Sequence, residues 1–134
     1  MIKLLLLEDD HVLAESLIEL LESENFDIVH VLNSQKALDE TFLQKFDLLL
    51  LDVNVPLFNG FELLKSLRDS GDKTPAIFLT ALTDIASLSK GFDVGADDYI
   101  KKPFDFDELL IRINAILKKQ YHTYSNELTL DDFH

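Results

Sequence analysis

Short, almost entirely apolar runs recur along this chain and alternate with longer segments in which apolar residues follow a helical period. Apolar runs of this kind are typical of strands covered on both faces, as in a parallel sheet, and the helical segments between them serve as crossovers. We count five such strand–helix units. The sequence therefore predicts an α/β fold built on a five-stranded parallel sheet.

The predicted elements leave only short connections between them. Strands are expected at residues 2–7, 27–32, 47–51, 76–79 and 98–101, and helices at residues 11–24, 34–45, 60–69, 84–94 and 106–119. The first and third strands are apolar almost throughout, which predicts central positions in the sheet. In the first and last helices, apolar stripes predict core packing; they consist of Leu13, Leu17, Leu20 and Leu21, and of Leu109, Ile113, Ile116 and Leu117.

Charge and composition exclude several classes of protein. Twelve Lys and Arg against 25 Asp and Glu give a net charge of −13, and without a concentrated basic patch these residues should not bind DNA or an anionic membrane by themselves. The chain has no cysteine, which excludes disulfides and thiolate metal sites. The apolar run at residues 4–7 is too short for a signal peptide, and no segment approaches the roughly 20 apolar residues of a membrane span. We expect a cytoplasmic protein.

Polar residues follow four of the predicted strands. Strand one ends in Glu8-Asp9-Asp10, strand three in Asp52, strand four in Thr80-Ala81, and strand five leads into Lys102-Pro103. In an open parallel sheet, ligands bind outside the carboxyl ends of the strands, so these groups are expected to converge on one edge.

The residue types at this edge indicate phosphoryl chemistry with a metal ion. Neighbouring carboxylates cannot all stay ionised without compensation, and oxygen ligands without Cys or His favour Mg²⁺. A carboxylate, a hydroxyl, an ammonium and a metal together suit phosphoryl transfer, in which a carboxylate is itself able to act as nucleophile. Each piece alone has an ordinary alternative: Asp10 as a helix N-cap, Thr80 as a cap or turn residue, and Lys102 as a solvated charge. Their joint placement favours the site.

The full set of motifs resembles the receiver domains of two-component response regulators. It comprises Glu8-Asp9, Asp52 followed by Pro56 and Gly60, Thr80-Ala81, Gly95-Ala96-Asp97-Asp98-Tyr99 and Lys102-Pro103-Phe104. The resemblance covers residues 1–119 and implies a flavodoxin-like, doubly wound sheet of strand order 2-1-3-4-5 with five helices. It implies a phosphoacceptor switch and not an enzyme, apart from self-phosphorylation from small phosphodonors and autodephosphorylation.

The resemblance also implies a role for each matching residue at the acidic end of the site. Asp52 would take the phosphoryl group from a phosphohistidine of a sensor histidine kinase. Asp9 would bind Mg²⁺ directly, Glu8 through water, and Asn54 through its backbone carbonyl, and Asp52 would belong to the same metal site.

On the other side of the site, the resemblance implies contacts with the phosphoryl group. Thr80, the Ala81 N–H and Lys102 would bind its oxygens, and Tyr99 would follow Thr80 inward as part of a switch, with simple packing of Tyr99 as the alternative. Pro103 would follow a cis peptide bond, with an ordinary trans turn as the alternative.

The segment from Gly95 onward resembles the OmpR/PhoB-type DNA-binding subfamily. That resemblance implies that phosphorylated chains form a homodimer through helix four, strand five and helix five, and a solvated charged face is the alternative. The candidate face consists of Ile85, Leu88, Lys90, Asp97, Asp98, Glu108, Arg112 and Lys119.

Residues 120–134 are expected to be a linker and the start of a winged-helix domain that would carry promoter DNA binding. Within them, residues 128–131 alternate like a short strand. As a tail outside the receiver, this segment is expected to be disordered or loosely docked.

Two other functions compete with this interpretation. Asp52-Val53-Asn54 superficially resembles the Asp-x-Asp start of haloacid dehalogenase-type phosphatases, but Asn54 cannot act as the general acid that this chemistry requires. A receiver-like interaction module that switches without phosphate is the second alternative, and the intact acids, Thr80 and Lys102 argue against it.

Overall fold

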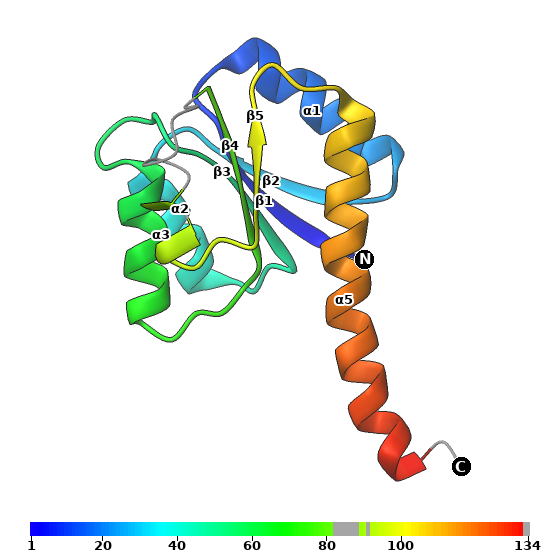
Figure 1. Ribbon diagram of the computed structural model, residues 1–134. Coiled ribbons are helices and arrows are strands. Elements are labelled where there is room, and N and C mark those ends of the chain that lie inside the picture. Colours follow the sequence, from blue (N-terminus) through cyan, green and yellow to red (C-terminus); the bar gives the residue numbers. More distant parts are fainter. Residues whose placement is uncertain (82–88, 91, 133–134) are drawn as a thin grey trace.

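Five parallel strands form one sheet in the order β2-β1-β3-β4-β5 (Figure 1). The computed structural model describes residues 1–81, 89–90 and 92–132, and for residues 121–132 it describes the backbone alone. The strands are β1 (Lys3–Leu7), β2 (Asp27–Val31), β3 (Leu48–Asp52), β4 (Ala76–Thr80) and β5 (Asp98–Lys101). The predicted α/β class, the parallel sheet and the strand order are confirmed, and β1 and β3 are central as expected.

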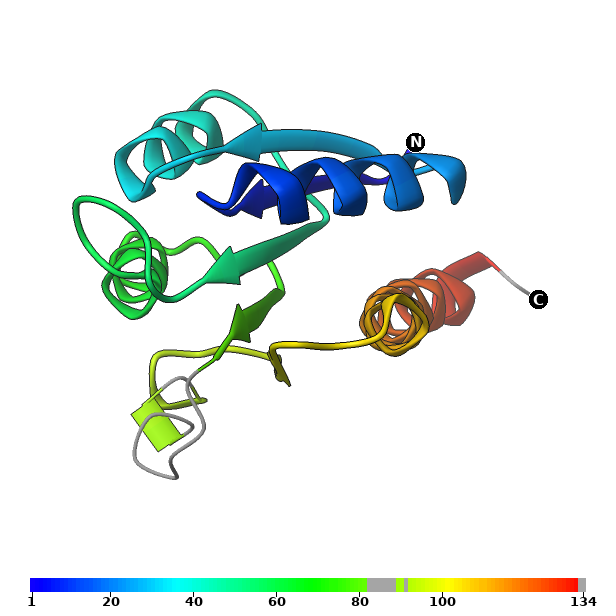
Figure 2. The same cartoon turned by 90° about the horizontal axis from the view of Figure 1, so that it is seen from above.

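Helices cover both faces of the sheet (Figure 2). They are α1 (His11–Ser23), α2 (Ser34–Leu43), α3 (Gly60–Asp69) and α5 (Phe106–Asp132). Helices α1 and α5 lie on one face, and α2 and α3 lie on the other. Most of the helix predicted at residues 84–94 lies outside the described residues, although residues 89–90 and 92–93 are helical.

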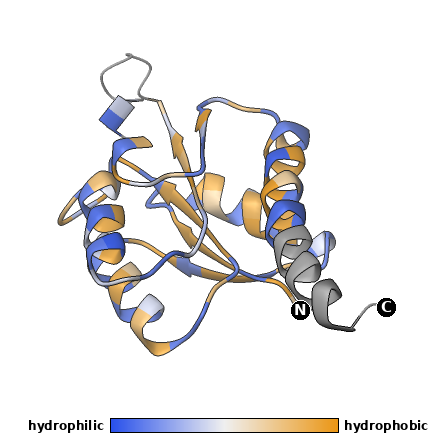
Figure 3. Cartoon of the chain, turned by 60° about the horizontal axis from the view of Figure 1, so that its bottom comes forward, coloured by the Kyte–Doolittle hydropathy of each residue, from blue (hydrophilic) through white to orange (hydrophobic). Residues whose placement is uncertain are grey.

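Alternate residues of the central strands enter two separate cores. In β1, Leu4 and Leu6 face α1 and α5, whereas Leu5 and Leu7 face α2 and α3, and all four are fully buried. This alternation follows from the pleat of a strand, in which successive side chains point to opposite faces. Burial on both faces explains why these strands are apolar at every position between Lys3 at the start of β1 and Asp52 at the end of β3 (Figure 3).

The predicted helix stripes form the outer halves of these cores. Leu17 and Leu21 of α1 are buried, as are Leu109, Ile113 and Leu117 of α5. The prediction that Leu20 packs in the core is wrong, because 39% of this residue is exposed. It lies at the margin of the stripe that Leu17 and Leu21 form, so the sheet does not cover it.

Helix α5 is longer than the sequence predicted. It continues to Asp132 and extends away from the sheet (Figure 1), so residues 128–131 are helical and the predicted short strand is wrong. No Gly or Pro interrupts residues 107–132, and a helix satisfies the backbone N–H and C=O groups of this segment internally.

Helix starts are fixed by side-chain caps. Asp10 caps α1 by accepting hydrogen bonds from the N–H groups of Val12 and Leu13, which confirms the ordinary interpretation of that residue. Asn59 and Glu62 form a capping box at α3. Among the helices of the described residues, none combines the length and the hydropathy needed to cross a bilayer.

Candidate functional site

The polar residues predicted at the strand ends do lie together at the carboxyl edge of the sheet. Leu7 of β1 is in register with Leu51 of β3, so Glu8 follows one strand beside Asp52 at the end of the next. Asp52 pairs with Leu79 of β4, and Thr80 pairs with Lys101 of β5. The sheet register therefore aligns the residues that follow four strands.

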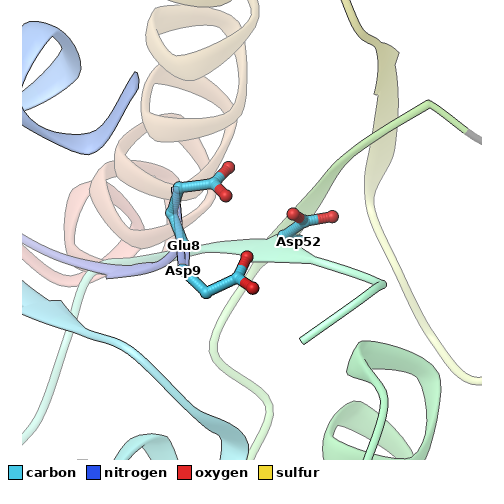
Figure 4. Close-up of side chains that lie close together, drawn as sticks. All are labelled: Glu8, Asp9 and Asp52. Carbon is cyan, nitrogen blue, oxygen red and sulfur yellow. The ribbon is translucent and has the colours of Figure 1, made fainter. Parts of the chain in front are cut away.

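Three carboxylates form the centre of the site (Figure 4). One oxygen from each of Glu8, Asp9 and Asp52 lies within 4.8 Å of the others. Glu8 is 1% exposed and Asp52 is 6% exposed, whereas Asp9 is open to solvent. Grouped acids with two buried members favour binding of a cation or a proton.

Lys102 is the cation that faces the two buried carboxylates. Its Nζ lies 2.5 Å from Glu8 Oε1 and 3.1 Å from Asp52 Oδ2. Burial raises the pKa of Glu8, and the charge of Asp52 acts in the same direction, while the hydrogen bond from Lys102 opposes both. Burial alone would lower the pKa of Lys102, but the hydrogen bond to Glu8 and the attraction of Asp52 outweigh it and raise the pKa. The lysine therefore stays charged between the two acids.

The backbone around Asp52 is closely supported by the start of α3. A Cβ at Gly60 would lie 2.4 Å from the Asp52 carbonyl oxygen, so only glycine allows this approach. The Gly60 N–H donates to the Val53 carbonyl at 2.9 Å, and the Asn54 N–H donates to Asp52 Oδ1 at 3.3 Å. These contacts fix the carboxylate at the strand end.

Thr80 and Tyr99 complete the opposite side of the site. Thr80 is fully buried at the end of β4, and its carbonyl accepts the Lys102 N–H at 2.8 Å. The half-buried Tyr99 ring packs beside Phe78, with 6.2 Å between ring centroids. The peptide bond between Lys102 and Pro103 is cis, as the resemblance implied.

Two residues at this edge of the sheet were not predicted from the sequence. His30 Nε2 lies 2.7 Å from the Glu8 carbonyl oxygen, and Ser34 hydrogen-bonds to the loop that follows Asp52. Both come from β2 and the start of α2. The only sequence signal is that β2 ends at the same edge as β1, which places these residues near the site without giving their contacts.

The donor set fits a magnesium ion. Three carboxylates lie together, the Asn54 carbonyl follows Asp52 closely in the chain, and the acidic group found among the described residues contains no Cys or His. Mg²⁺ is a hard cation that prefers oxygen ligands and keeps several waters, which suits a site with one open carboxylate.

Several residues of the predicted dimer face make contacts within the chain. Arg112 Nη1 donates to both carboxylate oxygens of Asp98, at 3.0 and 2.9 Å, and Nη2 donates to Glu108 at 3.5 Å. These contacts raise the pKa of Arg112, led by the hydrogen bond to Asp98. Asp97 is engaged inside the chain, since its carboxylate accepts the Ala76 N–H at 2.9 Å and lies 3.8 Å from Arg68.

Other members of that face are placed as follows. Lys90 Nζ lies 5.6 Å from the centroid of the Phe61 ring. Lys119 is exposed on α5. Ile85 and Leu88 lie outside the described residues.

Comparison with known proteins identifies the family. Residues 4–114 match the model of the response regulator receiver domain. The chain belongs to the receiver domain family. It is therefore a phosphoacceptor switch of two-component signalling, a class of signalling domains that are generally not enzymes, and the phosphatase interpretation of Asp52-Val53-Asn54 is not supported.

Curated relatives and solved structures agree with this assignment. The chain is 47% identical over 112 residues to the transcriptional regulatory protein CrdR of Helicobacter pylori, covering 83% of this chain and 53% of that protein. It is 41% identical over 129 residues to the transcriptional regulatory protein CiaR of Streptococcus pneumoniae, covering 96% and 57%. The Francisella response regulator 1452 receiver domain superposes with a TM-score of 0.86 at 32% identity, covering 90% and 99%. The chain thus spans about half the length of these curated relatives.

Proposed function

We propose that Asp52 is the phosphoryl acceptor and that a sensor histidine kinase supplies the group as a phosphohistidine. A carboxylate oxygen of Asp52 would attack phosphorus while the P–N bond breaks, and the imidazole nitrogen would keep the bonding electrons and take up a proton. The observation that carries this assignment is the position of Asp52 at the end of β3, beside Glu8 and within 3.1 Å of Lys102 Nζ.

Glu8, Asp9, Asp52 and the Asn54 carbonyl would hold a Mg²⁺ ion. When bound, the ion would neutralise charge that builds up on the transferring phosphoryl group. Asp9 is suited to direct coordination because it is open to solvent. Glu8 is suited to an indirect role through water, since Lys102 already occupies one of its oxygens.

Thr80, the Ala81 N–H and Lys102 would bind the oxygens of the phosphoryl group on Asp52. The support is their location, because Thr80 ends the strand beside Asp52 and Lys102 already contacts the carboxylate. The sheet places these groups beside Asp52 before the reaction, which limits the reorganisation needed to stabilise the new charge.

Output would pass through the face formed by β5, α5 and the segment before β5. A shift of Thr80 and Tyr99 toward the new charge would repack this face and favour a homodimer of phosphorylated chains. We propose that residues 1–119 form the receiver and that the segment from residue 120 leads to a winged-helix domain that binds promoter DNA. The support for a regulator of transcription in the cytoplasm is the resemblance to regulators about twice as long.

Acetyl phosphate and Mg²⁺ provide a test without the cognate kinase. The wild-type chain should gain one labile phosphoryl group by intact mass, and Asp52→Asn should gain none. An adduct that survives Asp52→Asn would contradict the assignment, and rapid turnover of a generic phosphate ester would favour a phosphatase. A receiver that switches without phosphate would form no adduct at all.

The dimer proposal needs its own measurement. Beryllium fluoride, which imitates a phosphoryl group on an aspartate, should shift the elution of the chain to that of a dimer in size-exclusion chromatography. An unchanged monomer would contradict the proposed output.

A further inference from the structure

The Ser34 hydroxyl bridges α2 to the loop that follows Asp52. Ser34 is fully buried, its Oγ donates to the Pro56 carbonyl at 3.1 Å, and it accepts the Phe58 N–H at 3.0 Å. The Ser34 N–H also points to the Pro56 carbonyl at 3.5 Å. One side chain therefore satisfies both a donor and an acceptor of a loop that lies more than 20 residues away.

Helix capping does not account for these contacts. A serine at a helix start ordinarily caps the helix through its hydroxyl. In α2, Asn33 takes that role, because its side chain accepts the Lys36 N–H at 2.8 Å. The Ser34 hydroxyl is instead directed to the loop.

The two bonded groups lie on either side of a residue in an unfavourable conformation. Leu57 has a φ of +82°, in the left-handed region that residues with a Cβ rarely adopt. Its side chain is 73% exposed, so core packing does not impose this conformation. The hydrogen bond that the Pro56 carbonyl accepts from Ser34 and the one that the Phe58 N–H donates to Ser34 hold Leu57 from both sides.

The loop held in this way carries part of the proposed metal site. It begins directly after Asp52 and contains Asn54, and its far end is fixed where the Gly60 N–H donates to Val53. Between these fixed ends, Val55 and Phe58 pack against the core, and the described hydrogen bonds from the loop to another element run to Ser34. Those hydrogen bonds fix the backbone of the loop on either side of Leu57, and we take the position of the Asn54 carbonyl to depend on them.

We propose that Ser34 is a positioning residue for the magnesium site, acting through the conformation of Leu57. The inference rests on the proposed function, because it takes Asn54 and Asp52 as metal ligands. Removing the hydroxyl would let Leu57 relax from positive φ, and the Asn54 carbonyl would move away from the carboxylates.

The test is the Mg²⁺ affinity of the folded chain. It is measured from the ¹H–¹⁵N NMR shifts of the backbone amides during titration with MgCl₂. Ser34→Ala should weaken binding about 10-fold, the lower limit for residues that orient metal ligands. Ser70→Ala is the matched control, since Ser70 Oγ donates to the Leu67 carbonyl at 2.8 Å at the far end of α3. Its affinity should equal that of the wild type, even if its thermal stability falls.

A second substitution separates positioning from general stability. Glycine adopts positive φ without steric cost, so Leu57→Gly should remove much of the need for the hydroxyl. Ser34→Ala should therefore weaken Mg²⁺ binding less in the Leu57→Gly chain than in the wild-type chain. The double variant also serves if Ser34→Ala alone fails to fold.

The outcomes separate the two proposals. If the wild-type chain shows no Mg²⁺-dependent shifts near Asp52, the proposed metal site itself fails. If the wild type binds Mg²⁺ and Ser34→Ala binds it equally well, the positioning role of Ser34 is wrong and the proposed function stands. Equal effects of Ser34→Ala in the two backgrounds would overturn the route through Leu57.

Discussion

Two groups of one cation and two carboxylates lie on this domain and differ mainly in burial. Lys102 joins Glu8 and Asp52 at the sheet edge, where the acid side chains are 1% and 9% exposed. Arg112 joins Asp98 and Glu108 on β5 and α5, where they are 25% and 48% exposed. Composition alone would not distinguish the two.

The difference in solvent access gives the two groups different energetics. Buried charges lose hydration, and their mutual attraction has to offset that loss, so removal of one partner leaves an uncompensated charge. Exposed pairs are screened and contribute little. The Lys102 group is therefore costly to disturb, whereas the Arg112 group can exchange its partners at little cost, as a contact surface would require.

The largest expected effect comes from removing the buried cation. In buffer without Mg²⁺, Lys102→Met should lower the free energy of unfolding by about 3 kcal/mol, because Glu8 and Asp52 are left as neighbouring acids. Urea denaturation measures this loss, and added Mg²⁺ should recover part of it. A loss no larger than that of Arg112→Met would contradict the view that burial makes the Lys102 group more costly to disturb than the Arg112 group.

A smaller effect is expected when bound Mg²⁺ neutralises the carboxylates of the site. Mg²⁺ at about 100 times its dissociation constant should add about 2.7 kcal/mol to the free energy of unfolding. Asp9→Asn should abolish most of that gain while leaving the stability without Mg²⁺ unchanged or higher, since it removes one of three like charges. Thermal denaturation with and without MgCl₂ checks both parts, and full stabilisation of Asp9→Asn by Mg²⁺ would argue against Asp9 as a ligand.

The smallest effect on the free energy of unfolding is expected at the exposed Arg112 group. Arg112→Met should change the free energy of unfolding by less than about 1 kcal/mol, and the change should shrink as salt rises. Urea denaturation at low and high NaCl measures it. A salt-independent loss of several kcal/mol would mean that this group stabilises the fold as the buried one does.

The sequence predicted the buried group because strand ends can be located from apolar runs. Once Leu4 to Leu7 and Leu48 to Leu51 are recognised as strands, Glu8 and Asp52 must follow at one edge. The parallel topology then brings Thr80 and Lys102 to the same edge. No detail of loop geometry is needed for this step.

Other features depended on loop and side-chain geometry and were not predictable. Ser34 and His30 reach partners more than 20 residues away through contacts that no local pattern encodes. The hydrogen bond that the Asp97 carboxylate accepts from the Ala76 N–H likewise joins residues 21 positions apart. The extension of α5 was missed because strand-like alternation at residues 128–131 does not indicate whether a neighbouring strand is present.

The most direct test of Asp52 as the phosphoryl acceptor is chemical identification of the residue that carries the phosphoryl group. After reaction with acetyl phosphate and Mg²⁺, reduction with borohydride converts an aspartyl phosphate to homoserine, which peptide mass spectrometry locates in the sequence. We predict homoserine at position 52 and unmodified Glu8 and Asp9. Homoserine at position 9, or the reduced form of a glutamyl phosphate at position 8, would contradict the account.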